Sequence, residues 1–335
     1  MAVTAKSPAK VTRRRDSTSA WGMAWRRFRR HKVALVGGTM IFLFVMAAIF
    51  APYITPYDFT KLQLTQRFQA PSLEVSQGAQ CVRDSVLFWE CGVHPFGTDD
   101  LGRDLLTRVF HGGRVSLLVG FVAATLAILI GTMVGATAAY SGGMIDSAIS
   151  RLIDIMLSLP VFPLLLILTG LLIGRDLPFG QWLETTFGTA KSVVVIISVI
   201  VLFNWMATAR LVRGEILSLK RREFADAARA LGGSHFRIIA RHLLPNAMAV
   251  VIVQLTLMMG EAILIESGLS FLGLGINPPE VSWGNMLSKA QGFFFFPNGI
   301  YTAVFPGLFI FLTVLCFNLL GDGLRDALDP RSIQK

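Results

Sequence analysis

The segment EFADAARALGGSHFRIIARHLLPN, residues 223–246, is polar and basic, yet strongly apolar segments lie on both sides of it. Its first half has the periodicity of a helix, with apolar residues at positions i, i+3, i+4 and i+7. These residues are Phe224, Ala227, Ala228 and Leu231. Charged side chains occupy most of the other positions, so we expect a surface helix here and not a membrane span.

A glycine pair divides this segment. Gly232 and Gly233 predict the end of the first helix, because glycine readily takes the left-handed geometry of a helix C-terminus. Ser234 can cap a second short helix, which we expect to stop before Pro245. The resulting helix–turn–helix has small residues at its tip, which suits insertion into a partner's groove. The alternative is a re-entry helix that packs only on its own bundle.

The composition and the placement of charge indicate a polytopic membrane protein. The 335 residues are 53% hydrophobic and 16% charged, with a mean hydropathy of +0.59. The net charge of +10 could suggest nucleic acid, but ten of the 31 Lys and Arg residues fall in 1–32 and eight in 210–246. Clusters of this kind in alternate loops follow the positive-inside rule and argue against a nucleic-acid face.

Six segments are apolar and long enough to cross a bilayer, which requires about 20 helical residues. They lie near residues 33–52, 115–140, 152–174, 191–209, 247–275 and 303–321. Because the basic N-terminus and the basic 210–246 loop should share a side, six spans place both termini in the cytoplasm. We therefore expect an all-α polytopic membrane protein whose 52–114 loop lies outside.

The chain then divides into five regions. Their order is a basic cytoplasmic N-terminus (1–32), a first transmembrane helix (33–52), an extracytoplasmic loop or lid (53–114), a core of five further transmembrane helices (115–321) and a cytoplasmic tail (322–335). A cleaved signal peptide is the alternative for the first apolar stretch, but its basic lead of 32 residues is long for one.

Two features lie outside the expected core. Trp21, Trp25 and Phe28 recur at i, i+4 and i+7 among arginines, which favours an interfacial helix over a disordered basic tail. Cys81 and Cys91 in the outer loop, with nine residues between them, predict a disulfide that pins a small lid. No His/Cys set has the spacing of a zinc site.

Within the spans, Pro160 and Pro163 predict a kink in the third helix. Glu261 and Glu266 are unusual, because a carboxylate in a span should face a partner or a wet cavity. We expect these two residues beside a translocation pathway. The alternative is a position near the outer interface, where the cost of burying a carboxylate falls.

The motifs of several enzyme classes are absent from the sequence. There is no Gly-Lys dipeptide and hence no P-loop for nucleotide phosphates, and neither HExxH nor a G-x-S-x-G elbow occurs. We therefore expect no catalytic residue on this chain, and a membrane-embedded enzyme or scaffold is disfavoured. A secondary transporter remains the main rival, although it predicts inverted repeats and an intramembrane charge relay.

The run DAARALGGSHFRIIARHLLPN resembles the EAA motif of bacterial ABC-importer permeases, E-A-A-x3-G-x9-I-x-L-P. The positions in register are Asp226, Ala227, Ala228, Gly232, Leu244 and Pro245. Asp226 replaces the usual Glu and His242 the usual Ile. Segments such as HPFGTDDLGRDLLTRVFHGGRVSL, SFLGLGINPPEVSWGNML and NLLGDGLRDALDPR resemble the C-type subunit of the dipeptide/oligopeptide branch. AWRRFRRHKVALVG resembles the N-terminus of the same subunit, and together these segments span about residues 21–331.

The resemblance implies a type I ABC-importer transmembrane domain with six transmembrane helices and a cytoplasmic coupling helix, in the bacterial inner membrane. It implies a B-type permease partner, two cytoplasmic ABC ATPases and an extracytoplasmic binding protein. ATP and Mg would be bound by those partners, with no cofactor on this chain. The ATPase-coupling residues would be Phe224, Ala225, Asp226, Ala227, Ala228, Arg229, Leu231, Gly232 and Pro245.

The resemblance leaves the substrate open. Di- and oligopeptides are the expected cargo, while nickel, glutathione or another small solute is the alternative. Selectivity in such systems belongs largely to the binding protein, which is a separate chain.

Overall fold

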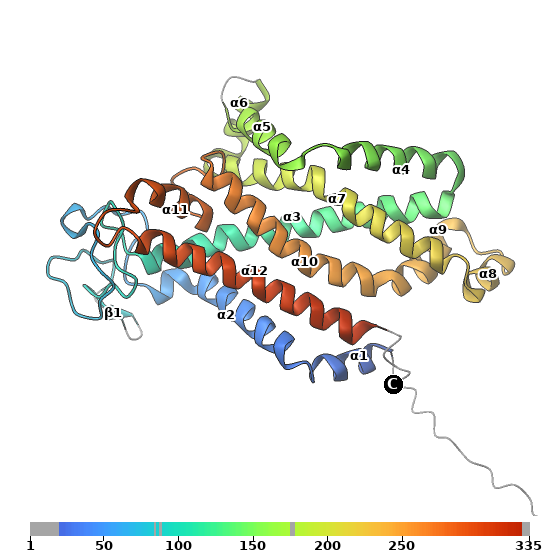
Figure 1. Cartoon of the computed structure of the whole chain (residues 1–335), viewed down its shortest axis with the longest axis horizontal. Helices are drawn as coiled ribbons and strands as arrows, with labels where there is room; N and C mark the ends of the chain where they lie inside the picture. Colours follow the sequence, from blue (N-terminus) through green and yellow to red (C-terminus); the bar gives the residue numbers. More distant parts are fainter. Residues whose placement is uncertain (1–19, 84, 87–88, 175–177, 330–335) are drawn as a thin grey trace, which may run out of the picture.

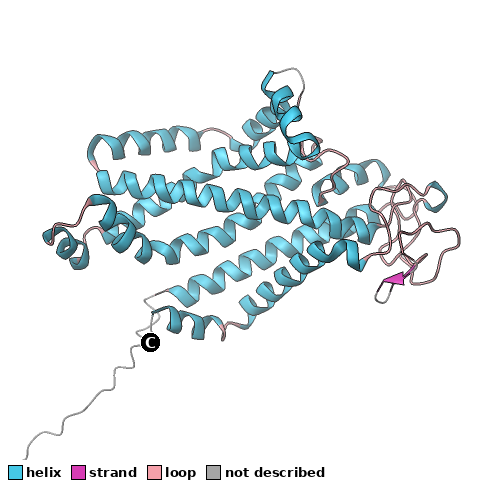
Figure 2. Cartoon of the chain, turned by 180° about the vertical axis from the view of Figure 1, so that it is seen from behind, coloured by secondary structure: helices cyan, strands magenta, loops and turns pink. Residues whose placement is uncertain are grey.

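The computed structural model describes residues 20–83, 85–86, 89–174 and 178–329. Five long helices run side by side along the molecule (Figure 1). They are α2 (Lys32–Ile54), α3 (Leu105–Ser141), α7 (Lys191–Leu219), α10 (Leu244–Phe271) and α12 (Tyr301–Leu328). The strands in the described residues form one hairpin, β1 (Ser85–Val86) and β2 (Trp89–Glu90), at one end of the molecule (Figure 2).

Shorter helices complete the fold. They are α1 (Ala20–Phe28), α4 (Gly143–Ser158), α5 (Val161–Ile173), α6 (Pro178–Phe187), α8 (Glu223–Ala230), α9 (His235–Ile238) and α11 (Trp283–Ala290). Single turns lie at η1 (Leu64–Gln66), η2 (Gly188–Ala190), η3 (Ile239–Leu243) and η4 (Gln291–Phe293). Helices α1 and α8 and the end of α12 lie opposite the end that carries the hairpin (Figure 1).

The predicted all-α, membrane-spanning architecture is confirmed. Five helices are long and apolar enough to cross a membrane; α4 and α5, bent by 85° at the break between them, make a sixth if the pair is counted as one span. The bend lies where the proline pattern predicts a kink, because α4 ends at Ser158 and Pro160 precedes α5. Helix α3 begins at Leu105, so the last residues assigned to the outer loop are helical.

The centre of the bundle is the packing of α3 against α7. Gly131 and Gly135 of α3 face the backbone and side chains of Trp205, Thr208 and Ala209, where a Cβ atom would clash. Small residues at this spacing let two membrane helices approach closely. The two helices therefore form a closely packed pair that runs from the end of the bundle that carries the lid to the base of α8.

The outer loop folds into a compact lid on the ends of the spans. Cys81 and Cys91 form a disulfide with their Cα atoms 5.9 Å apart. His94 is buried between Asp104, at 2.9 Å, and Gln66, at 3.0 Å. Because both ring nitrogens have a partner, the histidine ties two parts of the lid together.

The N-terminal helix α1 lies at the opposite end and packs against α12. Trp25 is 58% exposed and stacks on Phe28, with ring centroids 5.9 Å apart. Arg29 lies over the Trp25 ring at 5.8 Å. An exposed aromatic face beside arginines is what an interfacial helix presents to lipid headgroups. The side chain of Trp21 lies outside the described residues.

Candidate functional site

Helix α8 projects from the end of the bundle and leaves much of its surface uncovered (Figure 1). Ala225 is buried with 1% exposed, and Ala228 is half-buried, so this small face packs on the chain. Phe224 is 38% exposed and Leu231 is 89% exposed. The predicted apolar face is therefore not the face that packs: Phe224, Ala227 and Leu231 are exposed and only Ala228 is half-buried, while Ala225, outside the predicted face, is buried.

The turn after α8 is a Schellman motif. The N–H of Gly232 donates to the carbonyl of Arg229 at 3.0 Å, and that of Gly233 to Ala228 at 3.1 Å. Gly232 has a φ of +76°, which costs a side chain roughly 1–2 kcal/mol. Nothing lies within 4 Å of a Cβ placed on Gly232, so the need for glycine comes from the backbone conformation alone.

The second helix begins as the sequence predicts, but it does not stop before Pro245. Ser234 accepts a hydrogen bond from the N–H of Arg237 and caps α9. The chain then passes through the π-turn η3 into α10, where Pro245 occupies the first turn.

Arg229 fixes α8 to the preceding span. Its Nη2 atom donates to the carbonyl of Lys220 at 2.7 Å and lies 2.7 Å from Oδ1 of Asp226. Lys220 in turn donates through Nζ to the carbonyl of Tyr140 at 2.6 Å and lies over that ring. The ring of His235 meets Tyr140 edge-on at 5.2 Å. The ends of α3 and α7 and the helices α8 and α9 are thus joined in one network.

Sequence reasoning missed part of this network. The Asp226–Arg229 pair has an i, i+3 spacing that was visible in the sequence. The contact between Lys220 and Tyr140 joins residues 80 positions apart and leaves no local signal.

Helix α7 is also tied to α4. Arg213 pairs with both carboxylate oxygens of Asp146, at 2.5 and 2.8 Å. Arg210, one turn earlier on α7, pairs with Asp154. Ile153 is buried and Ile149, Met156 and Leu157 pack against the same apolar cluster, so α4 is held to the bundle by apolar contacts as well as by these ion pairs.

The two carboxylates of α10 have different surroundings. Glu266 is fully buried, and it accepts hydrogen bonds from Ser116 of α3 at 3.0 Å and Ser270 at 2.8 Å. Ser116 also accepts from the N–H of Trp283, so Glu266 anchors α3 and α11 to α10. Glu261 is exposed on another face, since five residues turn a helix by about 140°.

Comparison with known families identifies the chain. Residues 127–334 match the family described as binding-protein-dependent transport system inner membrane component. The chain belongs to this family. Residues 19–71 of this permease also match the N-terminal TM domain of oligopeptide transport permease C. The expected resemblance to the C-type subunit of peptide permeases is confirmed.

Full-length relatives agree with this assignment. The permease is 40% identical to a dipeptide transport system permease protein DppC from Alkalihalophilus pseudofirmus, over 94% of this chain and 91% of the relative. It is 35% identical to an oligopeptide transport system permease protein OppC from Bacillus subtilis, over 95% and 92%. A glutathione transport system permease protein GsiD from Escherichia coli is 36% identical over 93% and 90%. The family is therefore shared over nearly the whole length, while the cargo differs among relatives.

No three His, Cys, Asp or Glu side chains in the described ranges come together as ligands for a metal ion.

Proposed function

We propose that this chain is the C-type permease subunit of an ATP-driven importer that moves di- and oligopeptides across the bacterial cytoplasmic membrane. It pairs with a B-type permease, and an extracytoplasmic binding protein delivers the peptide to its outer end. The observation that carries the proposal is the exposed helix α8, joined through Arg229 and Lys220 to the long helices α7 and α3.

In this proposal, α8 is the coupling helix and seats in a groove of a cytoplasmic ATPase. Its outward residues, Phe224 and Leu231, supply apolar surface for that groove. Each partner ATPase binds ATP and Mg, which agrees with the missing P-loop. Closure of the ATPases moves α8, and the network at its base passes the movement to α3 and α7 as a rigid-body change between two states.

The topology follows from the same assignment. The basic loop 210–246 and the N-terminal helix α1 lie at one end of the molecule, and the lid lies at the other (Figure 1). We assign the α8 end to the cytoplasm by the positive-inside rule. The lid then faces the oxidising side, where a disulfide between Cys81 and Cys91 persists.

We assign Glu261 to the translocation pathway between the two permeases. An exposed carboxylate at the middle of a membrane helix needs a polar partner or water, and a peptide ammonium group is one such partner. Glu266 belongs to the internal support of the pathway, because its oxygens already bond to serines.

Two experiments test the proposal. Affinity purification from native membranes should recover this chain with two ATPases and a second permease; recovery of the chain alone, without an ATPase, would support a secondary transporter. Uptake of a labelled dipeptide into a strain lacking the permease should be restored by the wild-type gene and inhibited by unlabelled peptides. Stronger competition by glutathione would favour the cargo of the GsiD relative.

A further inference from the structure

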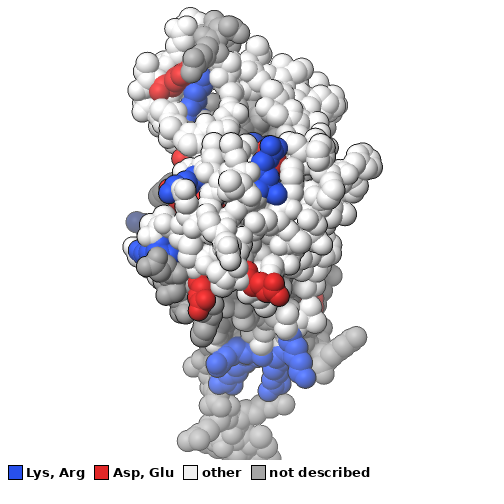
Figure 3. All heavy atoms as spheres, turned by 90° about the vertical axis from the view of Figure 1, so that its left-hand side faces the viewer, with Lys and Arg blue, Asp and Glu red and all other residues white. Residues whose placement is uncertain are grey.

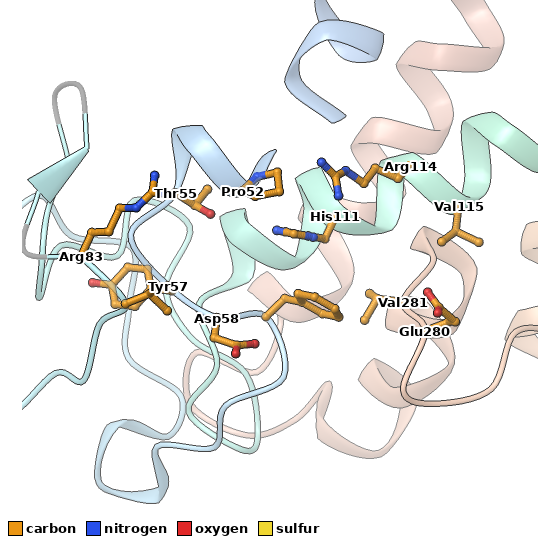
Figure 4. A pocket seen from close by; sticks show the side chains of 12 residues that line it. Pro52, Thr55, Tyr57, Asp58, Arg83, His111, Arg114, Val115, Glu280 and Val281 are labelled. Carbon is orange, nitrogen blue, oxygen red and sulfur yellow. The ribbon is translucent and has the colours of Figure 1, made fainter. Parts of the chain in front are cut away.

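A cavity of about 560 Å³ lies between the lid and the outer ends of α2 and α3 (Figure 4). It is separate from α8 and from the two carboxylates of α10. Six of its lining residues are ionisable: Tyr57, Asp58, Arg83, His111, Arg114 and Glu280. Its volume falls in the range of small-molecule sites.

The charges around this cavity do not neutralise one another. Asp58 and Glu280 form no ion pair with Arg83 or Arg114 in the described residues. The face of the molecule at the end that carries the lid is mostly uncharged, with small groups of basic and acidic side chains (Figure 3). Asp58, Arg83 and Arg114 are exposed and Glu280 is half-buried, so these charges remain open to solvent and to a ligand.

Arg114 is held by the end of α2. Its Nε donates to the carbonyl of Ala48 and its Nη2 to that of Ile49, both at 2.5 Å. The Ala48 carbonyl is free to accept because Pro52, four residues later, has no N–H to donate. The remaining nitrogen of the guanidinium, Nη1, takes part in neither of these bonds.

Asp58 is held by its own turn. Its Oδ1 accepts from the N–H of Thr60 at 2.8 Å and from the Thr60 hydroxyl at 2.7 Å. These hydrogen bonds hold the pKa of Asp58 below its ordinary value, so the carboxylate is ionised at neutral pH. Its Oδ2 takes part in neither bond and is left for a ligand.

Among the described residues, the ionised groups of Arg83 and Glu280 have the fewest hydrogen-bond and ion-pair partners in this cavity. Arg83 lies over the ring of Tyr53 at 5.8 Å, a contact that leaves its five N–H donors unused. Glu280 is half-buried and makes no hydrogen bond or ion pair within the described ranges. Figure 4 shows these two residues towards opposite sides of the cavity, with His111 and Arg114 of α3 between them.

We propose that this cavity binds a small zwitterion, whose primary ammonium group contacts Glu280 and Asp58 and whose carboxylate or phosphate contacts Arg83 and Arg114. The protein holds the four charges apart, so a ligand with both signs can satisfy them together. Two sources share this chemistry: a free dipeptide and the head group of phosphatidylethanolamine. The site does not depend on the proposed cargo, because it requires only an ammonium group and an anion on one small molecule.

The test measures binding to the purified full-length chain in nanodiscs of phosphatidylglycerol, which lacks an ammonium group. One arm titrates radiolabelled Ala-Ala, and the other titrates dihexanoyl phosphatidylethanolamine. Each arm is repeated with the N-acetylated compound, which lacks the positive charge. We expect saturable binding in at least one arm and loss of that binding on acetylation; the arm that binds identifies the source.

Variants of the cavity locate the site. Glu280→Gln and Arg83→Gln should each weaken the binding about tenfold or more, since each removes a charge-assisted contact. Glu74→Gln, an exposed lid carboxylate outside the cavity, is the matched control and should bind like wild type. A melting temperature equal to wild type shows that each variant is folded. The proposal is overturned if neither zwitterion binds saturably, or if binding is equal in wild type and in both cavity variants.

Discussion

The guanidinium of Arg229 in α8 donates to the carbonyl of Lys220 at the end of α7, at a distance of 2.7 Å. Because a helix C-terminus carries partial negative charge, a cation at this position stabilises the end of α7 as well as the position of α8. The exposed helix therefore has a defined orientation before any partner binds. A coupling element must be rigid at its base if it is to transmit movement to the spans.

Replacing Arg229 should uncouple the transporter without unfolding it. In Arg229→Ala, α8 loses its bond to Lys220, and we expect transport to fall about tenfold or more while membrane insertion stays normal. Arg237→Ala is the control: this arginine of the same loop is exposed, and its side chain makes no hydrogen bond or ion pair within the described residues, so uptake should stay near that of wild type. Uptake of a labelled dipeptide in reconstituted vesicles measures both. Equal uptake by Arg229→Ala and wild type would contradict the proposal that Arg229 holds α8 in the position needed for coupling.

Gly232→Val should abolish transport and transport-coupled ATP hydrolysis while leaving the chain in the membrane. The residue has a φ of +76°, which a β-branched side chain adopts only with strain, so the turn after α8 must change. Gly214→Ala in α7 is a suitable control, because a Cβ there meets nothing within 4 Å. Normal uptake by Gly232→Val would remove α8 from the coupling pathway.

The fold was predictable where a strong local signal exists. Hydropathy located the five long helices and the bent α4–α5 pair, and the glycine pair located the end of α8. The packed face of α8 was not predictable, because Ala225 and Phe224 are neighbours in a helix of eight residues, and periodicity over two turns does not separate them. The predicted bounds of two long spans were also too short. The helical hydrogen bonds of α3 and α7 continue past the ends of the apolar stretches from which those bounds were taken.

The candidate site was predictable only in part, for the same reason. Carboxylates are rare in a membrane span, so the sequence drew attention to Glu261 and Glu266. No neighbouring residue indicates that one of them is exposed and the other buried. The distinction arises from Ser116, which lies 150 positions before Glu266 and meets it only in the folded bundle. Contacts between distant residues of this kind require the three-dimensional arrangement of the helices.

Glu266 and Glu261 should respond differently to the same substitution. Glu266→Ala leaves buried serine hydroxyls without an acceptor, which costs about 1–3 kcal/mol or more and lowers the melting temperature. Glu261→Ala should leave the melting temperature near that of wild type and reduce peptide uptake. Thermal unfolding in detergent and uptake in vesicles measure the two effects. Unchanged uptake of every peptide by Glu261→Ala would return this residue to a structural role.

The disulfide of the lid should resist alkylation. We expect a thiol reagent to label neither Cys81 nor Cys91 in the denatured, unreduced protein, and to label both after reduction. The buried Cys316 provides the internal control, because it should be labelled on denaturation in both samples. Labelling of both lid cysteines without reduction would show that they are free thiols in the cell.

The ion pair between Asp146 of α4 and Arg213 of α7 offers a test of how movement reaches the bent span. Asp146→Arg and Arg213→Asp each place like charges together, and each should impair transport by tenfold or more. The double variant restores opposite charges with the positions exchanged and should recover part of the lost activity. A matched exchange at Asp154 and Arg210, which are 63% and 54% exposed, should have a smaller effect because solvent screens that pair. Single variants with wild-type uptake would mean that α4 moves independently of α7; a double variant no better than the singles would mean that the pair acts through another contact.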